Sequence, residues 1–105
     1  MEEIYLTVSE ESDVIIVIDE HSFNLHFYPF RGLMYLDLSK DGEIVASGQR
    51  VIANQWLLPL YMMDECGNFR FETYKPDANQ YVWWEGYNQM FRLVSYTKTE
   101  IEEMG

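Results

Sequence analysis

A few residues of the chain are of types that could carry chemistry, and two glutamates come closest to a catalytic pair. Glu72 and Glu85 lie in neighbouring aromatic segments, and a pair of carboxylates flanking a sugar could hydrolyse a glycosidic bond. Because the chain holds 18 acidic residues, such pairs are common, and both glutamates also fit outward positions of alternating strands. The sequence has no nucleophile elbow and no glycine-rich phosphate loop. We therefore predict no catalytic residue, and a small hydrolase is the weakest reading of the chain.

The two histidines and the one cysteine are the remaining candidates for chemistry. His21 and His26 are five residues apart on an alternating segment, so they would point to opposite faces of a regular strand and make poor co-ligands. Cys66 follows Asp64 and Glu65, and the chain has no second thiol for a disulfide. We predict that Cys66 is buried or incidental, that there is no metal site and that no cofactor binds.

Aromatic side chains are the most informative content, with three tryptophans, eight tyrosines and six phenylalanines. Trp83 and Trp84 must face opposite sides if they lie on a strand, so one fills the core and the other is exposed or covered by a partner. Exposed Trp and Tyr side chains typically anchor protein interfaces or form platforms for sugars. The predicted interface residues are Phe30, Arg31, Arg50, Trp56, Trp83 and Trp84.

The charge of the chain is uneven. The net charge is −11, and residues 1–20 carry seven acidic residues and no Lys or Arg, while residues 100–105 carry three more acids. Phosphate binding needs clustered basic residues, so this pattern argues against nucleic acid or an anionic membrane as a partner. It favours a basic protein partner, and the alternative explanation is solubility through net negative charge.

The elements that must position these residues are predicted to be strands. Phe23, Leu25 and Phe27 alternate with polar neighbours, and Pro29 should interrupt that strand, with a bulge or sharp bend before Gly32. Asp41-Gly42 is a strong hairpin signal, and Gly48 predicts either a second bulge or a close approach of the backbone.

Further segments complete a β pattern. Alternation at Ile4–Val8 predicts a first strand, and the apolar run within Asp13–Glu20 predicts a strand that is either buried on both faces or at an edge covered by a partner. Residues 54–61 fit a short helical turn or an irregular strand equally well. The other predicted features are a loop at 64–68, a polar turn at 75–80, strands near 69–74, 81–87 and 90–96, and an acidic helix or loose tail after Thr97.

These elements add up to an all-β fold, a small single-domain β-barrel or β-sandwich of about eight short antiparallel strands. We expect one domain over residues 1–105, with an acidic N-terminal segment and a short acidic C-terminal tail. The longest apolar run, Val14–Ile18, is too short to span a bilayer, and the acidic start is unlike a signal peptide. The chain is therefore expected to be soluble and made in a cytoplasm.

The segment "FNLHFYPFRGLMYLDLSKDGEIVASGQRVIANQWLLP" resembles the small baseplate plug proteins of contractile-tailed bacteriophages. The resemblance covers roughly Phe23 to Leu60 and extends more loosely over Phe69 to Tyr96, whereas "YPFRG" and the acidic ends go beyond the family's core. The matching positions are Phe23, Leu25 and Phe27, then Asp37 and Asp41-Gly42, then Gly48 and Val51, then Leu57-Leu58.

The resemblance implies a non-enzymatic structural protein that packs in several copies in the virion tail baseplate, near hub, tube or tube initiator, and spike. In such an assembly Arg31 and Arg50 would reach carboxylates of adjacent subunits, since the planar guanidinium binds them bidentately. The alternative is that both arginines are solvated or paired within the chain. A carbohydrate-binding β module, using the exposed aromatics, is the second reading of the whole chain.

Overall fold

The computed structural model describes residues 1–59, 66–74 and 81–104, and these residues form seven strands, one short 3-10 helix and one α-helix. The elements are β1 (Glu2–Ile4), β2 (Ser12–Ile18), β3 (His21–Phe30), β4 (Leu33–Lys40), β5 (Glu43–Arg50), β6 (Asn68–Thr73), η2 (Trp84–Gly86), β7 (Phe91–Tyr96) and α1 (Lys98–Met104). The predicted all-β class is confirmed.

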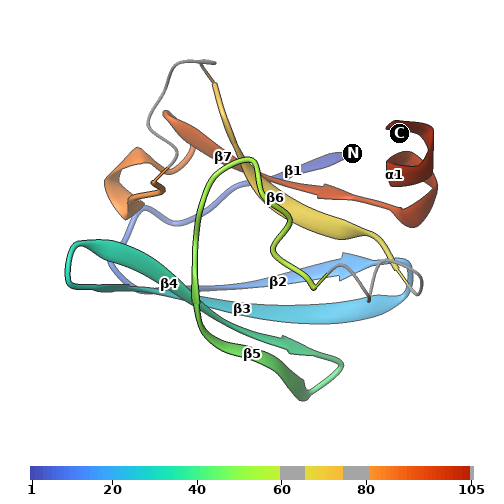
Figure 1. Ribbon diagram of the computed structural model, residues 1–105, viewed down its shortest axis with the longest axis horizontal. Coiled ribbons are helices and arrows are strands. Elements are labelled where there is room, and N and C mark those ends of the chain that lie inside the picture. Colours follow the sequence, from blue (N-terminus) through green and yellow to red (C-terminus); the bar gives the residue numbers. More distant parts are fainter. Residues whose placement is uncertain (60–65, 75–80, 105) are drawn as a thin grey trace.

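The strands form two antiparallel sheets that face each other (Figure 1). One sheet has the order β2-β3-β4-β5 and the other the order β1-β7-β6. The two sheets do not close into a barrel, so of the two predicted architectures the sandwich is the observed one.

Aromatic side chains fill the space between the sheets. The ring of Phe23 on β3 meets that of Phe69 on β6 edge to face at 5.5 Å, and Phe27 meets Phe71 in the same way at 5.5 Å. The Tyr87 ring stacks on Phe71 at 5.8 Å. All five side chains are fully buried, so the predicted alternation of β3 is confirmed on its inner face. Edge-to-face pairs of this kind stabilise the core beyond the area that they bury.

Two-residue turns with positive φ join the four strands of the larger sheet. Asp41 and Gly42 have φ values of 50° and 87°, and Arg31 and Gly32 have values of 51° and 79°. Such turns match the right-handed twist of the strands they connect. The predicted Asp41-Gly42 hairpin and the bend before Gly32 are therefore both confirmed.

Pro29 does not interrupt β3, contrary to the prediction. It pairs with Met34 of β4, next to the pair Phe30–Leu33 that flanks the Arg31-Gly32 turn. Because hydrogen-bonded and non-bonded pairs alternate, the nitrogen of Pro29 points away from β4, toward the β2 side. The strand β2 does not extend as far as Pro29, since its first residue, Ser12, lies opposite Phe27. The missing N–H of proline therefore costs the sheet no hydrogen bond.

Of the two alternatives predicted at Gly48, the bulge is the observed one. The register between β4 and β5 shifts twice between Leu36 and Ser39, and Gly48 has a φ of 66°. The N–H of Gly48 donates to Oδ1 of Asp37 at 2.8 Å. Asp37 thus holds the bulge in place.

Three predicted strands need correction. Residues 81–84 do not form a regular strand: Tyr81 makes one isolated bridge with Ile52, and η2 begins at Trp84. The first strand covers Glu2–Ile4 instead of Ile4–Val8. The strand β2 is not buried on both faces, because Ile16 and Ile18 face the core whereas Ile15 and Val17 face solvent; the alternative of an edge strand is the observed one.

The chain after β7 forms the helix α1 rather than a loose tail. The hydroxyl of Thr97 accepts from the N–H of Glu100 at 3.2 Å, and the Glu100 carboxylate accepts from the N–H of Thr97 at 2.9 Å. This reciprocal capping box satisfies two backbone donors that a helix start leaves open.

Parts of other predictions fall outside the described residues: the turn at 75–80 entirely, the loop at 64–68 over its first two residues and the segment 54–61 over its last two. Residues 54–59 are neither helix nor regular strand. No described helix has the length and apolar content that a membrane-crossing helix requires.

Candidate interaction surfaces

The outer face of β6 and β7 carries a closed set of polar contacts around Glu72. Its carboxylate accepts hydrogen bonds from Nε of Arg70 at 3.0 Å, from Nη2 of Arg92 at 3.1 Å and from the hydroxyl of Tyr96 at 2.5 Å. The Glu72 side chain is only 13% exposed. We call these four residues the Glu72 network. The largely buried carboxylate is hydrogen-bonded by two cations of its own chain, so it is not available to an outside partner.

The environment of Glu72 is the opposite of what a catalytic acid needs. Burial alone would raise its pKa, but the hydrogen bonds from Tyr96, Arg70 and Arg92 outweigh burial and lower the pKa below its ordinary value. A general acid at neutral pH requires a raised pKa. The other predicted partner, Glu85, accepts from Nε1 of Trp83 at 3.1 Å. This geometry gives no support to a carboxylate pair.

Trp56, one of the predicted interface residues, belongs to the surroundings of the Glu72 network. The guanidinium of Arg70 lies over its ring at 4.4 Å, and the Tyr96 ring is perpendicular to it at 5.6 Å. The ring is half-buried, with one face occupied by a cation of its own chain.

A second surface lies at the end of the four-stranded sheet where the Arg31-Gly32 turn is found. The Arg31 guanidinium sits over the Phe30 ring at 5.2 Å, and the Phe30 ring meets Tyr35 at 6.1 Å. Tyr35 pairs with Arg50, whose guanidinium lies over the Tyr81 ring at 4.8 Å. We call these five residues the basic–aromatic corner. Three of them were predicted from the sequence: Phe30, Arg31 and Arg50.

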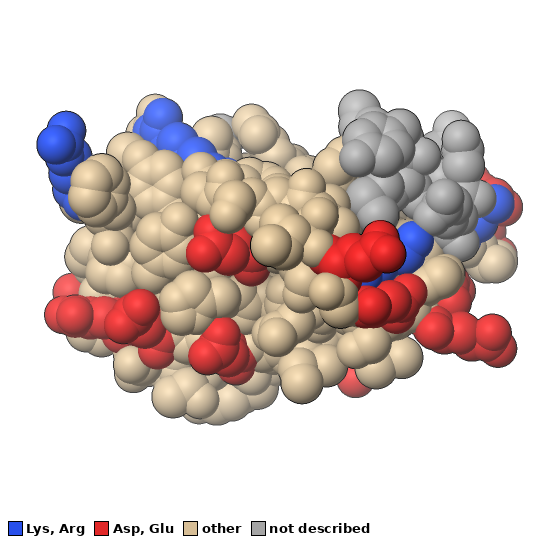
Figure 2. Space-filling model, turned by 90° about the horizontal axis from the view of Figure 1, so that it is seen from below, with Lys and Arg blue, Asp and Glu red and all other residues tan. Residues whose placement is uncertain are grey.

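The basic–aromatic corner is exposed to solvent, whereas the charged groups of the Glu72 network are paired with one another. Phe30 is 55% exposed and Tyr81 is 50% exposed. Within the described residues neither Arg31 nor Arg50 forms an ion pair with a carboxylate; their contacts are with aromatic rings. Viewed from the β5 side, basic side chains gather at the upper left and at the right, and acidic ones are spread between and below them (Figure 2).

Trp83 and Trp84 do not face opposite sides, because they do not lie on a strand. Their ring centroids are 6.4 Å apart at a tilt of 43°, and both side chains are half-buried against the core. The segment of residues 81–90 lies at the same end of the molecule as the Arg31-Gly32 turn (Figure 1). The structure therefore brings both tryptophans to the end that carries the basic–aromatic corner, as a partly packed pair.

Histidine and cysteine positions give no joint site. His21 and His26 are five residues apart on β3 and so lie on opposite faces, as predicted. Nδ1 of His21 is 2.7 Å from Oδ2 of Asp41, and Nδ1 of His26 is 2.8 Å from Oδ1 of Asp13. Cys66 is fully buried, which confirms the first of its two predicted states. The described residues contain no group of three or more potential ligands close enough to hold a metal ion.

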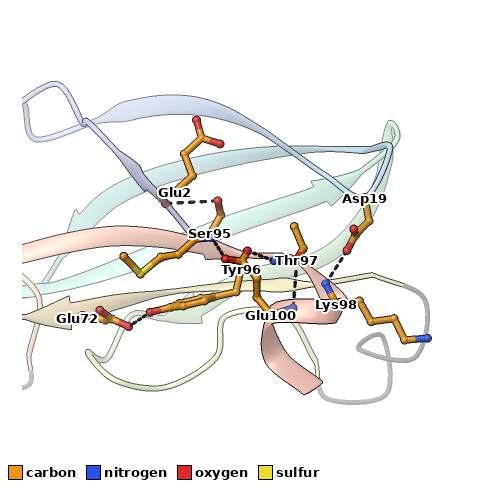
Figure 3. A network of polar contacts seen from close by, with 9 residues as sticks. Glu2, Asp19, Glu72, Ser95, Tyr96, Thr97, Lys98 and Glu100 are labelled. Carbon is orange, nitrogen blue, oxygen red and sulfur yellow. Dashed lines mark hydrogen bonds and ion pairs between the residues drawn. The ribbon is translucent and has the colours of Figure 1, made fainter. Parts of the chain in front are cut away.

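Asp19 is a position that the sequence pattern missed. It lies in the β2–β3 turn, and its Oδ2 accepts from the backbone N–H of Gly67 and of Lys98, each at 2.8 Å. Figure 3 shows how this carboxylate reaches the start of α1, beside the capping contacts of Thr97 and Glu100. The bonds tie one end of the four-stranded sheet to the other layer. No local signal marks Asp19, since its partners are 48 and 79 residues away.

Two tyrosines of the basic–aromatic corner were also missed. Tyr35 could have been found by counting pairs back from the Arg31-Gly32 turn, which places Tyr28 opposite Tyr35 on the outer face. Tyr81 could not, because its contact with Arg50 depends on a non-local bridge to Ile52.

Comparison with known proteins gives one family. A family model described as the cyanophage baseplate Pam3 plug gp18 matches residues 1–98 of the 105. A search of curated proteins finds no match. The matched range includes both sheets, the basic–aromatic corner and the Glu72 network.

Proposed function

The chain belongs to the family of the cyanophage baseplate Pam3 plug gp18, and on that basis we propose that it is a structural, non-enzymatic protein of a contractile tail baseplate. It packs as a plug near the central hub and the tail tube, in several copies for each particle, and is made in the host cytoplasm. Its partners are other baseplate proteins: hub, tube or tube initiator, and spike. Nucleic acid and membrane are not among its partners.

The observation that carries the proposal, beyond the family, is the open basic–aromatic corner. Arg31 and Arg50 are exposed and have no carboxylate partner among the described residues, although the chain is strongly acidic. Phe30 offers an exposed apolar ring beside them. An aromatic anchor flanked by guanidinium groups is the composition typical of interface hot spots. In the assembled baseplate these arginines bind carboxylates of an adjacent subunit, and Trp83 and Trp84 border the same contact.

A double variant, Arg31→Ala with Arg50→Ala, tests this role in phage assembly. Since both side chains make few contacts within the chain, the variant should fold normally but enter purified baseplates about tenfold less than the wild type, the effect of losing about 1.4 kcal/mol. The matched control is Arg31→Lys with Arg50→Lys, which keeps the charge and loses the planar guanidinium. Its incorporation should lie between that of the wild type and that of the double alanine variant. Normal incorporation of the double alanine variant would rule the corner out as an interface.

A carbohydrate-binding module remains a second candidate, supported by a different feature. On the outer face of the four-stranded sheet the rings of His26, Tyr28 and Tyr35 stack in a row at 5.6 and 6.1 Å. A shallow pocket of about 230 Å³ lies beside the row, lined in part by Asp13, Asn24, Asp37 and Ser39. Binding of a glycan by the isolated protein, lost in a Tyr35→Ala variant, would favour this candidate; a glycan array without any signal would eliminate it.

A further inference from the structure

The four edges of the two sheets are not equally protected. The outer side of β6 is covered, since the N–H groups of Asn54 and Leu57 donate to carbonyls of β6. The strand β1 has three residues, and β5 is irregular because its register against β4 shifts twice. By contrast β2 is a regular seven-residue edge strand with no shift. Short strands and bulges protect an edge from pairing with another chain, and β2 has neither device.

The register shows which groups of β2 face outward. The two-residue turn at Asp19-Glu20 makes Ile18 and His21 a hydrogen-bonded pair, so alternation along β2 directs the backbone of every second residue toward β3. The backbone N–H and C=O groups of Asp13, Ile15 and Val17 therefore point away from the sheet. No hydrogen bond to these backbone groups occurs within the described residues. We call these three residues the β2 edge.

Apolar side chains lie on the same residues that offer these backbone groups. Ile15 and Val17 are each 67% exposed. Two exposed β-branched side chains next to an open row of donors and acceptors form a template for an added strand. Because an exposed apolar edge strand can pair with another chain, an edge of this kind in a native protein is a candidate interaction site.

Charge decides what kind of chain fits the β2 edge. Glu11 and Asp13 lie at one end of β2, and Asp19 and Glu20 follow its other end. A pocket of about 200 Å³ adjoins Val17 and is lined in part by Glu2, Asp19, Ser95, Thr97 and Glu100. An extended segment that pairs with β2 therefore meets carboxylates at both of its ends.

We propose that the β2 edge binds an extended segment of another baseplate protein, which adds to the sheet as a fifth strand. The segment carries β-branched or other apolar residues at alternate positions, which cover Ile15 and Val17, and Lys or Arg near both ends. This inference rests on the proposed function for the identity of the partner and goes beyond it in naming the site, the binding mode and the chemistry. A second copy of the same chain is the less suitable occupant, because two acidic segments of residues 1–20 would then lie side by side.

Hydrogen–deuterium exchange resolved at single amides tests the pairing directly. The amides of Ile15 and Val17 should exchange quickly in the isolated protein and at least about tenfold more slowly in assembled baseplates, since they become hydrogen-bonded. The amides of Val14 and Ile16, which face β3, should be protected in both samples. Fast exchange of Ile15 and Val17 inside the particle would overturn the proposal. Protection in the isolated protein, together with dimers in sedimentation, would also overturn it in favour of self-pairing.

Proline variants provide a second and independent measurement. Ile15→Pro removes an outward N–H and leaves the bonds to β3 in place, so the fold should persist. The matched control is Ile44→Pro on β5, where the non-bonded pair with Ser39 also directs the N–H outward. Ile15→Pro should enter baseplates at least about tenfold less than the wild type, a loss of about one buried hydrogen bond with its partner left unpaired, whereas Ile44→Pro should enter normally.

The experiments distinguish a wrong function from a wrong binding site. If the wild-type chain is absent from purified baseplates, the proposed function is wrong. If the wild type is present and Ile15→Pro enters as well as Ile44→Pro does, the proposed function stands and the strand addition is wrong. Should Ile15→Pro unfold, the exchange experiment on the wild type decides the matter without it.

Discussion

The outer faces of the two sheets carry the same kinds of side chain in different arrangements. On β6 and β7, Arg70 and Arg92 converge on one carboxylate, Glu72. At the end of the other sheet, Arg31 and Arg50 rest on aromatic rings and point toward solvent. All four arginines contact aromatic rings, so the presence of the carboxylate makes the difference.

We expect the paired arginines to contribute to the stability of the fold and the arginines on exposed rings to contribute to assembly. A guanidinium paired with a half-buried carboxylate contributes to the fold, and removal of the partner leaves it desolvated without compensation. A guanidinium over an exposed ring keeps most of its solvation, so its loss hardly affects folding, while its fork stays available to another protein. Four predictions probe this comparison, ordered by the expected effect on the free energy of unfolding.

The largest effect is expected for Glu72→Ala. The change leaves Arg70 and Arg92 without their carboxylate and the Tyr96 hydroxyl without its acceptor. We expect a loss of about 3 kcal/mol in the free energy of unfolding, measured by urea denaturation. The control is Glu43→Ala, an exposed position of β5, which should change stability by less than about 0.5 kcal/mol. Equal effects of the two changes would contradict the comparison.

The next effect is a dependence on pH that belongs to Glu72. Its pKa is lower in the folded chain than the ordinary value of 4.5, because hydrogen bonds to the carboxylate outweigh burial. Its contribution to stability is therefore complete above pH 4.5 and is lost as the pH falls through the folded pKa. The stability difference between wild type and Glu72→Gln should shrink at acid pH; a constant difference would show that the charge of Glu72 is irrelevant.

A smaller effect should distinguish two buried tyrosines. Tyr96→Phe removes a hydrogen bond to Glu72 and should cost about 1 kcal/mol. The hydroxyl of Tyr87 is buried with no hydrogen-bond partner in the described part of the chain, and burial raises its pKa. Tyr87→Phe should therefore be neutral or stabilising by up to about 1 kcal/mol in thermal unfolding. A marked loss of stability in Tyr87→Phe would reveal a partner for that hydroxyl.

The smallest effect is expected at the basic–aromatic corner. Arg31→Ala and Arg50→Ala should each change the free energy of unfolding by less than about 0.5 kcal/mol, since both side chains are exposed. If either variant lost as much stability as Glu72→Ala, the corner would be part of the fold rather than a surface kept open for a partner. Urea denaturation of all three variants under one set of conditions makes the comparison.

Several features of this protein were predictable because they depend on neighbours in the sequence. Alternation placed Phe23, Leu25 and Phe27 on the inner face of a strand, since side chains of a strand alternate between its two faces. Asp41-Gly42 predicted a hairpin because those residue types adopt positive φ at low cost. A short acidic helix was one of the two predictions for the residues after Thr97, and the contacts between Thr97 and Glu100 that cap it are likewise local.

What failed, or could not be predicted, depended on pairing between distant segments. Alternation around Trp83 and Trp84 suggested a strand, but none of the strands described in the structure pairs with them, and η2 begins at Trp84 instead. Pro29 lies inside a strand because β2 ends before reaching it. The convergence of Arg70 and Arg92 on Glu72 and the openness of the β2 edge likewise follow from which strands are neighbours. A strand's periodicity specifies which face is apolar, but its neighbours are set by the packing of the whole chain. The sequence by itself therefore determined most of the strands and turns, and the tertiary structure decided which surfaces are paired within the chain and which remain exposed.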